Sequence, residues 1–255
     1  MLGRNTDRAW EKFGVRDPYY GVTAQAAFHR ESLDEAARAD FFERGEAHVE
    51  RVLAAIREDL DVDYVPRRVL DFGCGVGRLV IPFARRAEHV LGADVSPSML
   101  AEARKNCTER GVQNVRFVRS DDALSQVEGT YDLVHSYIVF QHIPVRRGLR
   151  LFERLLDHLA PGGVGALHFT FARSRKRRVI ALLKAIPLVT SLSNVVRGRP
   201  LSTPQMQMNA YDLNALFMRL HRRGIRRIHA RLTNHGGELG ALLFFQAPPA
   251  AGDGA

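Results

Sequence analysis

The sequence predicts an α/β fold in which a mostly parallel sheet carries helices on both faces, and two observations predict it. From about residue 66, short apolar runs alternate with helical patterns, as is typical of parallel strands joined by crossover helices. Near the end of the chain, two apolar runs are joined only by NHGGEL, residues 234–239. Because this link is too short for a parallel crossover, these two strands must be antiparallel to each other.

The predicted elements follow in order along the chain. Five apolar runs are predicted strands of the parallel part of the sheet: 68–72, 89–95, 115–119, 131–136 and 164–171. Helices are expected between them near 78–87, 97–110 and 148–160, and a further helix at 211–222 precedes the antiparallel pair at 225–232 and 240–246. The helix at 97–110 has the clearest ends, because Ser96 can cap it, Pro97 suits its first turn and Gly111 can end it.

The flanking regions complete the predicted domain organisation. We expect residues 1–65 to be an N-terminal helical segment that packs on the main domain at 66–247. Within that segment, residues 1–31 read as irregular, and a helix is expected from Ser32, whose spacing to Glu35 suits a capping box. Residues 173–210 are expected to form a cap insertion after the fifth strand, and residues 248–255 a disordered tail.

The strongest chemical motif is VLDFGCGVGRL, residues 69–79, in which an apolar strand meets a glycine-rich turn and then a helical stretch. Glycines allow the backbone to turn sharply and to approach a bound nucleotide closely, with a helix N-terminus behind it. The spacing departs from the dinucleotide fingerprint GxGxxG, because the third glycine comes one residue early and Arg78 stands in its place. Asp71 suits a ligand with a cationic ammonium group better than a pyrophosphate.

Two further acidic positions follow the next strands. Asp94 ends the second strand, 23 residues after Asp71, where its carboxylate can accept hydrogen bonds from both hydroxyls of a ribose. Asp121 or Asp122 ends the third strand and can accept the exocyclic amine of an adenine. The register of this adjacent pair stays open, and one of the two is expected to be a solvated acid.

Residues 66–172 resemble the class I S-adenosylmethionine-dependent methyltransferases. The matching segments, in family order, are VLDFGCGVG, GADVSPSML, the acidic pair, YDLVHSYIVFQHI and LLDHLAPGGVGALHF. The resemblance implies a Rossmann-like, doubly wound sheet of seven strands whose last strand is antiparallel. It also implies S-adenosylmethionine as cofactor and S-adenosylhomocysteine as product. The cofactor-binding residues that it implies are Asp71, Gly73, Cys74, Gly75, Gly77, Asp94, Val95, Met99, Asp121, Asp122, Ala123 and Ser136.

Within this resemblance the residues have distinct roles. Asp71 and the glycine loop would hold the methionine end, Asp94 the ribose, and the acidic pair with Ala123 the adenine. Since a sulfonium is already an activated methyl donor, the protein has mainly to align the acceptor and exclude water, although a hydroxyl acceptor can need a general base. His142 is the candidate base; the competing reading, a histidine that only packs or bonds to the backbone, is given more weight. Tyr20, Tyr137, Gln141 and His235 are candidate substrate residues, and no metal site is expected.

The net charge of +9 is unevenly distributed. Residues 1–172 hold 23 basic and 25 acidic residues, whereas residues 173–255 hold 14 basic and 3 acidic ones. Residues 173–178, RSRKRR, precede an apolar stretch, which suggests either a solvated basic face beside a lid or a peripheral contact of residues 173–196 with an anionic membrane. The solvated face is the favoured reading.

We therefore expect a cytoplasmic methyltransferase that acts on a small molecule, with oxygen as the acceptor atom. The alternatives are a membrane-associated enzyme for a lipid-linked or amphiphilic substrate and an RNA methyltransferase. A nucleic-acid partner is disfavoured, because Ser136-Tyr137-Ile138-Val139 stands where enzymes that methylate exocyclic base nitrogens carry an Asn/Asp-Pro-Pro-aromatic motif. A nicotinamide-dependent oxidoreductase is disfavoured by Arg78, and a non-catalytic cofactor-binding or membrane-adaptor protein with the same fold stays open. The sequence does not give the oligomeric state.

Overall fold

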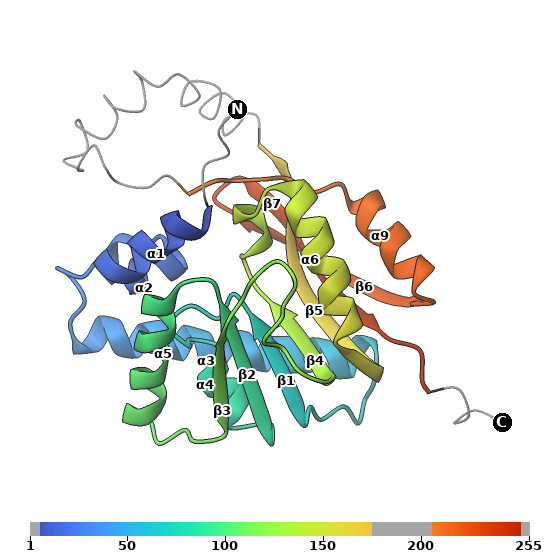
Figure 1. The fold of residues 1–255 in the computed structure, drawn as a ribbon, viewed down its shortest axis with the longest axis horizontal. Helices are drawn as coiled ribbons and strands as arrows, with labels where there is room; N and C mark the ends of the chain where they lie inside the picture. Colours follow the sequence, from blue (N-terminus) through green and yellow to red (C-terminus); the bar gives the residue numbers. More distant parts are fainter. Residues whose placement is uncertain (1–5, 175–205, 251–255) are drawn as a thin grey trace.

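The computed structural model describes residues 6–174 and 206–250, and its centre is a seven-stranded sheet with the order β3-β2-β1-β4-β5-β7-β6 (Figure 1). The strands are β1 (Arg68–Phe72), β2 (His89–Asp94), β3 (Val115–Arg119), β4 (Tyr131–Ser136), β5 (Leu159–Arg173), β6 (Arg227–His235) and β7 (Glu238–Gln246). The pairs among β1 to β5 are parallel, and β7 is antiparallel to both of its neighbours. The predicted seven-stranded α/β sheet with an antiparallel last strand is therefore confirmed.

Helices cover both faces of the sheet. Successive side chains of a strand point to opposite faces, and the parallel strands carry apolar side chains on both faces, so each face must be covered. On one face, Val69 and Leu133 pack with α3 (Glu35–Asp59), α4 (Val80–Ala84) and α5 (Pro97–Glu109). On the other face, Leu70 and Phe169 pack with α6 (Val145–Asp157) and α9 (Leu213–Arg222). This double winding leaves the carboxyl ends of the parallel strands open at one edge, where ligands of such sheets bind.

The N-terminal region differs most from the sequence prediction. Residues read as irregular form α1 (Thr6–Arg16), α2 (Pro18–Thr23) and the short 3-10 turn η1 (Ala26–Phe28). These elements carry few regular apolar repeats, since they pack through an aromatic cluster that includes Phe13, Tyr19, Phe28 and Phe41 rather than through one long stripe. Figure 1 shows α1 and α2 beside α5, near the open edge of the sheet.

Several predicted boundaries also shift. Asp34, not Ser32, caps α3, because its side chain accepts a hydrogen bond from the amide of Ala37. The expected helix at 78–87 shortens to α4, and β5 begins at Leu159, ahead of the strand predicted at 164–171. The cap of α5 is as predicted: Ser96 accepts from the amide of Met99.

The remaining regions bear on two of the sequence predictions. Residues 175–205, most of the predicted cap at 173–210, lie outside the described residues, as do 251–255 of the predicted tail. The division into a segment at 1–65 and a domain at 66–247 stays a prediction. Among the helices that the structure describes, none is long and apolar enough to cross a membrane.

Candidate active site

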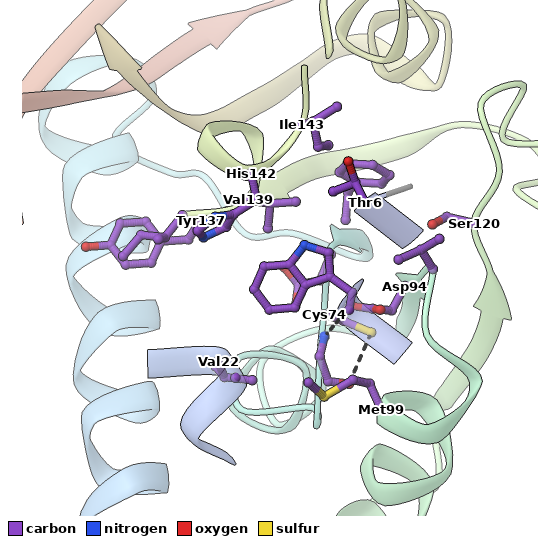
Figure 2. Close-up of a pocket in the computed structure, with 18 of the residues that line it drawn as sticks. Thr6, Val22, Cys74, Asp94, Met99, Ser120, Tyr137, Val139, His142 and Ile143 are labelled. Carbon is purple, nitrogen blue, oxygen red and sulfur yellow. Dashed lines mark hydrogen bonds between the residues drawn. The ribbon is translucent and has the colours of Figure 1, made fainter. Parts of the chain in front are cut away.

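A pocket lies at the carboxyl ends of β1, β2 and β4, where the strand order reverses direction. This reversal is the point at which doubly wound sheets bind ligands. In Figure 2, Asp94 and Ser120 lie on one side of the pocket and Tyr137 and His142 on the other. Asp94 and Ser120, with Asp121 and Asp122, form the end at which the sequence predicts ribose and adenine, and we call it the ribose–adenine end. Tyr137 and His142, with Asp71 and the glycine loop, form the end at which the sequence predicts the methionine part of a cofactor, and we call it the methionine end.

The glycine loop reaches the pocket because its backbone adopts conformations that side chains resist. Gly73 and Gly75 line the pocket with φ angles of +77° and +53°. A Cβ atom on Gly73 would lie 2.3 Å from a methyl carbon of Val139, so the loop packs directly on the segment that follows β4. Ile138 in that segment has a φ of +60°, a strained backbone conformation for a β-branched residue. Strained residues of this kind are found most often at functional sites.

Asp94 is held from behind by two backbone amides. Its carboxylate accepts from the amide of Gly75 at 2.9 Å and from the amide of Ser96 at 2.9 Å. Burial in the pocket raises the pKa of Asp94 to about 6, against the lowering effect of these two hydrogen bonds. The side chain therefore ties the glycine loop to the start of α5 and presents a desolvated carboxylate to the pocket, as binding of ribose hydroxyls requires.

Asp71 is fixed by a buried histidine pair. Its Oδ1 accepts from Nδ1 of His135 at 2.7 Å, and Nε2 of His135 lies 3.3 Å from Nε2 of His48 on α3. Since a carboxylate only accepts, Nδ1 of His135 carries the proton of this hydrogen bond. Burial keeps the pKa of His48 well below its usual value, so the His48 ring is neutral at pH 7. His135 thus orients Asp71 and leaves its second oxygen for a ligand.

The two acids at the end of β3 are both engaged by protein groups. Asp121, which lines the pocket, accepts at 3.0 Å from the amides of Ala123 and Ser125, so its side chain closes its own turn. Asp122 accepts from Arg147 at 2.6 Å and is not among the lining residues. Arg147, on α6, also binds Asp7 of α1 at 2.6 Å. This end of the pocket is therefore built from ion pairs that remain partly exposed.

Helix α1 forms one wall of the pocket and is tied down at two points. Trp10 lines the pocket, and Asp7 forms the ion pair with Arg147. On the other side of α1, Glu11 accepts from the hydroxyl of Ser96 at 2.6 Å and from the hydroxyl of Ser98 at 2.6 Å. A carboxylate at these first residues of α5 is stabilised by the helix dipole.

His142 lies in the pocket but both of its ring nitrogens have partners. Nδ1 donates to the carbonyl oxygen of Gln207 at 2.7 Å, and Nε2 accepts from the amide of Gln141 at 3.1 Å. The Gln141 oxygen accepts from the Thr170 hydroxyl at 2.8 Å, which fixes the orientation of the amide. Burial lowers the pKa of His142 to about 4, so the ring is neutral at pH 7. Trp10 packs against its edge at a ring distance of 4.9 Å.

The remaining predicted residues divide between the pocket wall and the layer behind it. Gly73, Cys74, Gly75, Asp71, Asp94, Val95, Met99, Asp121, Tyr137 and His142 line the pocket. Gly77, Asp122, Ala123, Ser136, Gln141, Tyr20 and His235 do not. Ser136 donates instead to the carbonyl of Phe72 at 2.8 Å, Tyr20 stacks on His29, and His235 lies 3.4 Å from the Tyr137 hydroxyl oxygen.

Four lining residues that bear on chemistry are not predicted from the sequence: Asp7, Trp10, Arg78 and Arg147. Three of them depend on α1, whose residues have no regular apolar repeat. Arg78 departs from the dinucleotide glycine fingerprint, and its place directly after the glycine loop is the signal that could have indicated it.

The sheet order, the glycine loop and the acids at the ends of β1 and β2 define the class I S-adenosylmethionine-dependent methyltransferase fold. Residues 69–163 match the family model described as a methyltransferase domain. A magnesium protoporphyrin IX methyltransferase from Synechocystis PCC 6803, solved with bound S-adenosylmethionine, superposes with a TM-score of 0.61. At 18% identity over 97% of this chain and 99% of that one, the match shows the shared fold.

Curated relatives cover the same core and differ in their acceptors. A trans-aconitate 2-methyltransferase from Deinococcus radiodurans is 37% identical over 102 residues, 39% of this chain and 36% of that protein. A demethylmenaquinone methyltransferase from Thermus thermophilus is 37% identical over 112 residues, 41% of this chain and 48% of that protein. A 23S rRNA (uracil(1939)-C(5))-methyltransferase from Aeromonas salmonicida is 28% identical over 131 residues, 51% of this chain and 26% of that protein. The chain spans less than half the length of each of these relatives.

Proposed function

We propose that this protein transfers the methyl group of S-adenosylmethionine to an oxygen of a small-molecule acceptor. The observation that carries the proposal is the pocket at the strand-order reversal, where Asp71 and Asp94 face a glycine loop shaped for close approach of a ligand. These residues fit the cofactor: a carboxylate for its ammonium group, a second for its ribose, and no side chain on Gly73 or Gly75 to exclude it.

The chain's own residues have three tasks in this reaction. Bound S-adenosylmethionine supplies an activated methyl group on a sulfonium. Asp71 and Asp94 hold two ends of the ligand, which fixes the direction in which the methyl group points. Trp10, on α1, and Val22, on α2, add apolar wall and exclude water from that point. Such a wall suits a small organic acceptor.

The proposal that oxygen is the acceptor atom is supported by two titratable side chains at the methionine end of the pocket. His142 and Tyr137 line the pocket, and a neutral imidazole can take the proton of a hydroxyl acceptor. For His142 to act as a base, Gln141 must release Nε2, because its amide occupies the lone pair. Replacing His142 with Phe keeps a ring against Trp10; full turnover of this variant would assign His142 to packing.

Calorimetry with S-adenosylhomocysteine tests the cofactor step directly. We expect one site per chain, and absence of binding to the folded protein would contradict the proposed function. The acceptor step is tested with S-adenosylmethionine and a panel of small carboxylic acids and phenols, with methylated products identified by mass spectrometry. Product that carries the methyl group only on nitrogen or carbon would contradict oxygen as the acceptor atom.

Contact with an anionic membrane through residues 173–196 stays a separate proposal. The proposal is supported by the basic sequence RSRKRR at residues 173–178. Of residues 173–196, the structure describes only 173 and 174. Sedimentation with anionic vesicles at low and high salt tests it, because electrostatic binding weakens as salt screens the charges.

A further inference from the structure

A cluster of aromatic and imidazole rings lies on the side of the pocket away from Asp94. Tyr137 lines the pocket directly after β4, and in Figure 2 its ring extends away from Asp94, toward α3. The ring centroid of His48, on α3, lies 4.0 Å from that of Tyr137, and those of His168 and His235 lie 5.2 Å and 5.9 Å from it. We call these four residues the imidazole cluster. It joins the end of β4 to α3, to β5 and to the turn between β6 and β7.

The protein satisfies the polar atoms of the imidazole cluster only in part. The Tyr137 hydroxyl oxygen lies 3.4 Å from Nε2 of His235, which is longer than a normal hydrogen bond between such groups. His168 is fully buried; its Nε2 lies 2.8 Å from the Thr233 hydroxyl oxygen, but its Nδ1 has no partner in the described chain. Buried polar atoms are rarely left unpaired. The cluster therefore has hydrogen-bonding capacity that a ligand can use.

The imidazole cluster has an accessible layer and a buried one. Tyr137 and His235 are partly exposed, whereas His48 and His168 are buried. Gly240 of β7 makes room for the buried layer, because a Cβ atom there would lie 2.4 Å from Nε2 of His168. Tyr137 and His235 are therefore the members that a ligand can contact, on a layer whose packing fixes their positions.

The fixed charges beside the imidazole cluster are positive. Arg51 lies one helical turn after His48 on α3, is exposed, and has no hydrogen-bond or ion-pair partner among the residues that the structure describes. Burial raises the pKa of Tyr137, and the charges of Arg78 and Arg51 oppose this shift, so both guanidinium groups act at the phenol. A negatively charged group beside Tyr137 would be stabilised by these charges.

The acids beside the cluster are already engaged. Glu238, opposite His235 in the β6–β7 register, is paired with Arg173 at 3.2 Å, and Asp71 accepts from His135. Burial lowers the pKa of His235, so its ring is neutral at pH 7 and carries one N–H donor. The accessible layer thus offers donors and positive charge, without a free acid to balance them in the described chain.

A carboxylate on the methyl acceptor fits this arrangement. Its two oxygens can accept from a phenol and an imidazole together, and its charge is opposite to that of Arg51. We infer that Tyr137, His235 and Arg51 bind a carboxylate of the acceptor. Because the Tyr137 ring extends away from Asp94, this carboxylate orients the acceptor, and a second oxygen of the same molecule receives the methyl group. The substrate class is then a small hydroxy acid or dicarboxylic acid, an inference that rests on the proposed function.

The test compares small acids with their primary amides, which keep the shape of the acid and lose its charge. Salicylate, 4-hydroxybenzoate and succinate, each with its amide, are titrated by calorimetry into the protein saturated with S-adenosylhomocysteine. Because hydrogen bonds to charged groups are the stronger ones, at least one acid should bind about ten- to hundredfold more tightly than its amide. His235→Phe, which keeps a ring, should lower this ratio about tenfold, and Arg51→Met, which removes an exposed charge, about two- to fivefold.

Arg57→Met is the matched control, because Arg57 lies on the same helix but donates to the carbonyl oxygen of Tyr64. It removes the same charge and should leave the ratio unchanged. A loss of stability weakens acid and amide alike, so only their ratio reports carboxylate recognition. No preference for any of the acids in the wild type, or a ratio that neither His235→Phe nor Arg51→Met lowers, would overturn the inference. If the folded wild type does not bind S-adenosylhomocysteine, the proposed function fails; if it binds that ligand and prefers no acid, only the carboxylate site fails.

Discussion

The two ends of the pocket are built in opposite ways. At the methionine end, Asp71, His135 and His48 are buried and form one line of hydrogen bonds inside the domain. At the ribose–adenine end, Arg147 pairs with Asp7 and Asp122, whose side chains remain 37% and 51% exposed. A buried polar group is costly to leave unpaired, whereas an exposed ion pair exchanges readily with water. The methionine end should therefore be rigid and the other end adjustable.

The largest expected effect comes from Asp94, an acid of the ribose–adenine end that two backbone amides hold. Asp94→Ala removes the acceptor for the ribose hydroxyls and for the amides of Gly75 and Ser96. With two hydrogen bonds to a charged group lost, the dissociation constant for S-adenosylhomocysteine should rise at least about a hundredfold. Asp132→Ala is the control, since Asp132 likewise accepts from two backbone amides, those of Arg67 and Arg68, but at the amino end of β4. Comparable losses in both variants would show that Asp94 acts through stability alone.

His135→Phe tests the rigidity of the methionine end. The ring volume is kept, but the buried carboxylate of Asp71 loses the donor at its Oδ1. We expect the free energy of unfolding to fall by about 2–3 kcal/mol, measured by urea denaturation, because a hydrogen bond to a charged group is lost in the interior. His158→Phe removes a histidine that donates to the carbonyl of Gly129 at the surface and should cost much less. Similar losses for the two variants would contradict the contrast between the ends.

Cofactor affinity should also depend on pH through Asp94. Its pKa is raised from 3.8 to about 6, so the carboxyl is protonated below about pH 6 in the free protein. Since binding of ribose hydroxyls favours the carboxylate, affinity for S-adenosylhomocysteine should fall by up to about tenfold per pH unit as the pH drops below about 6. Calorimetry between pH 5 and 8 measures it. A pH profile that is the same in Asp94→Asn as in the wild type would assign the dependence to another group.

The smallest effect is expected at Arg147. Arg147→Gln removes two partly exposed ion pairs, which together should contribute about 1 kcal/mol or less to folding. Because salt screens exposed charges, the difference in melting temperature between wild type and variant should shrink between 0.05 and 0.5 M sodium chloride, concentrations chosen to span roughly a threefold change in Debye length. A large loss that salt does not change would mean that this end is as rigid as the other.

The sequence was informative wherever a local pattern determines a local structure. The glycine spacing of residues 73–77 required a tight turn, and these glycines have positive φ angles. Ser96 caps α5 because its hydroxyl can reach an amide three residues away, a relation that depends on sequence distance alone. By contrast, the lining role of Trp10 and the pairing of Asp7 with Arg147 join residues far apart in the chain, and no periodicity signals them.

The excess of arginine in the last third of the chain illustrates the same limit. Arg219, Arg223 and Arg231 pair with Glu153, Asp157 and Asp59, acids of α6 and α3 that lie far away in the sequence. These three arginines of the last third thus neutralise acids of the first two thirds of the chain. Residues 175–205, which hold the rest of the basic run that begins at Arg173, lie outside the described residues.

The class of fold, the glycine loop and the carboxylates at the ends of β1 and β2 can be predicted from the sequence, because each depends on residues within one strand-turn-helix unit. Which polar groups remain available for a ligand cannot be predicted in this way. Asp122 and His142 have their hydrogen bonds made by other parts of the chain, whereas Nε of Arg78 has no partner in the described chain. The availability of a polar group depends on which distant side chains folding brings within hydrogen-bonding distance of it.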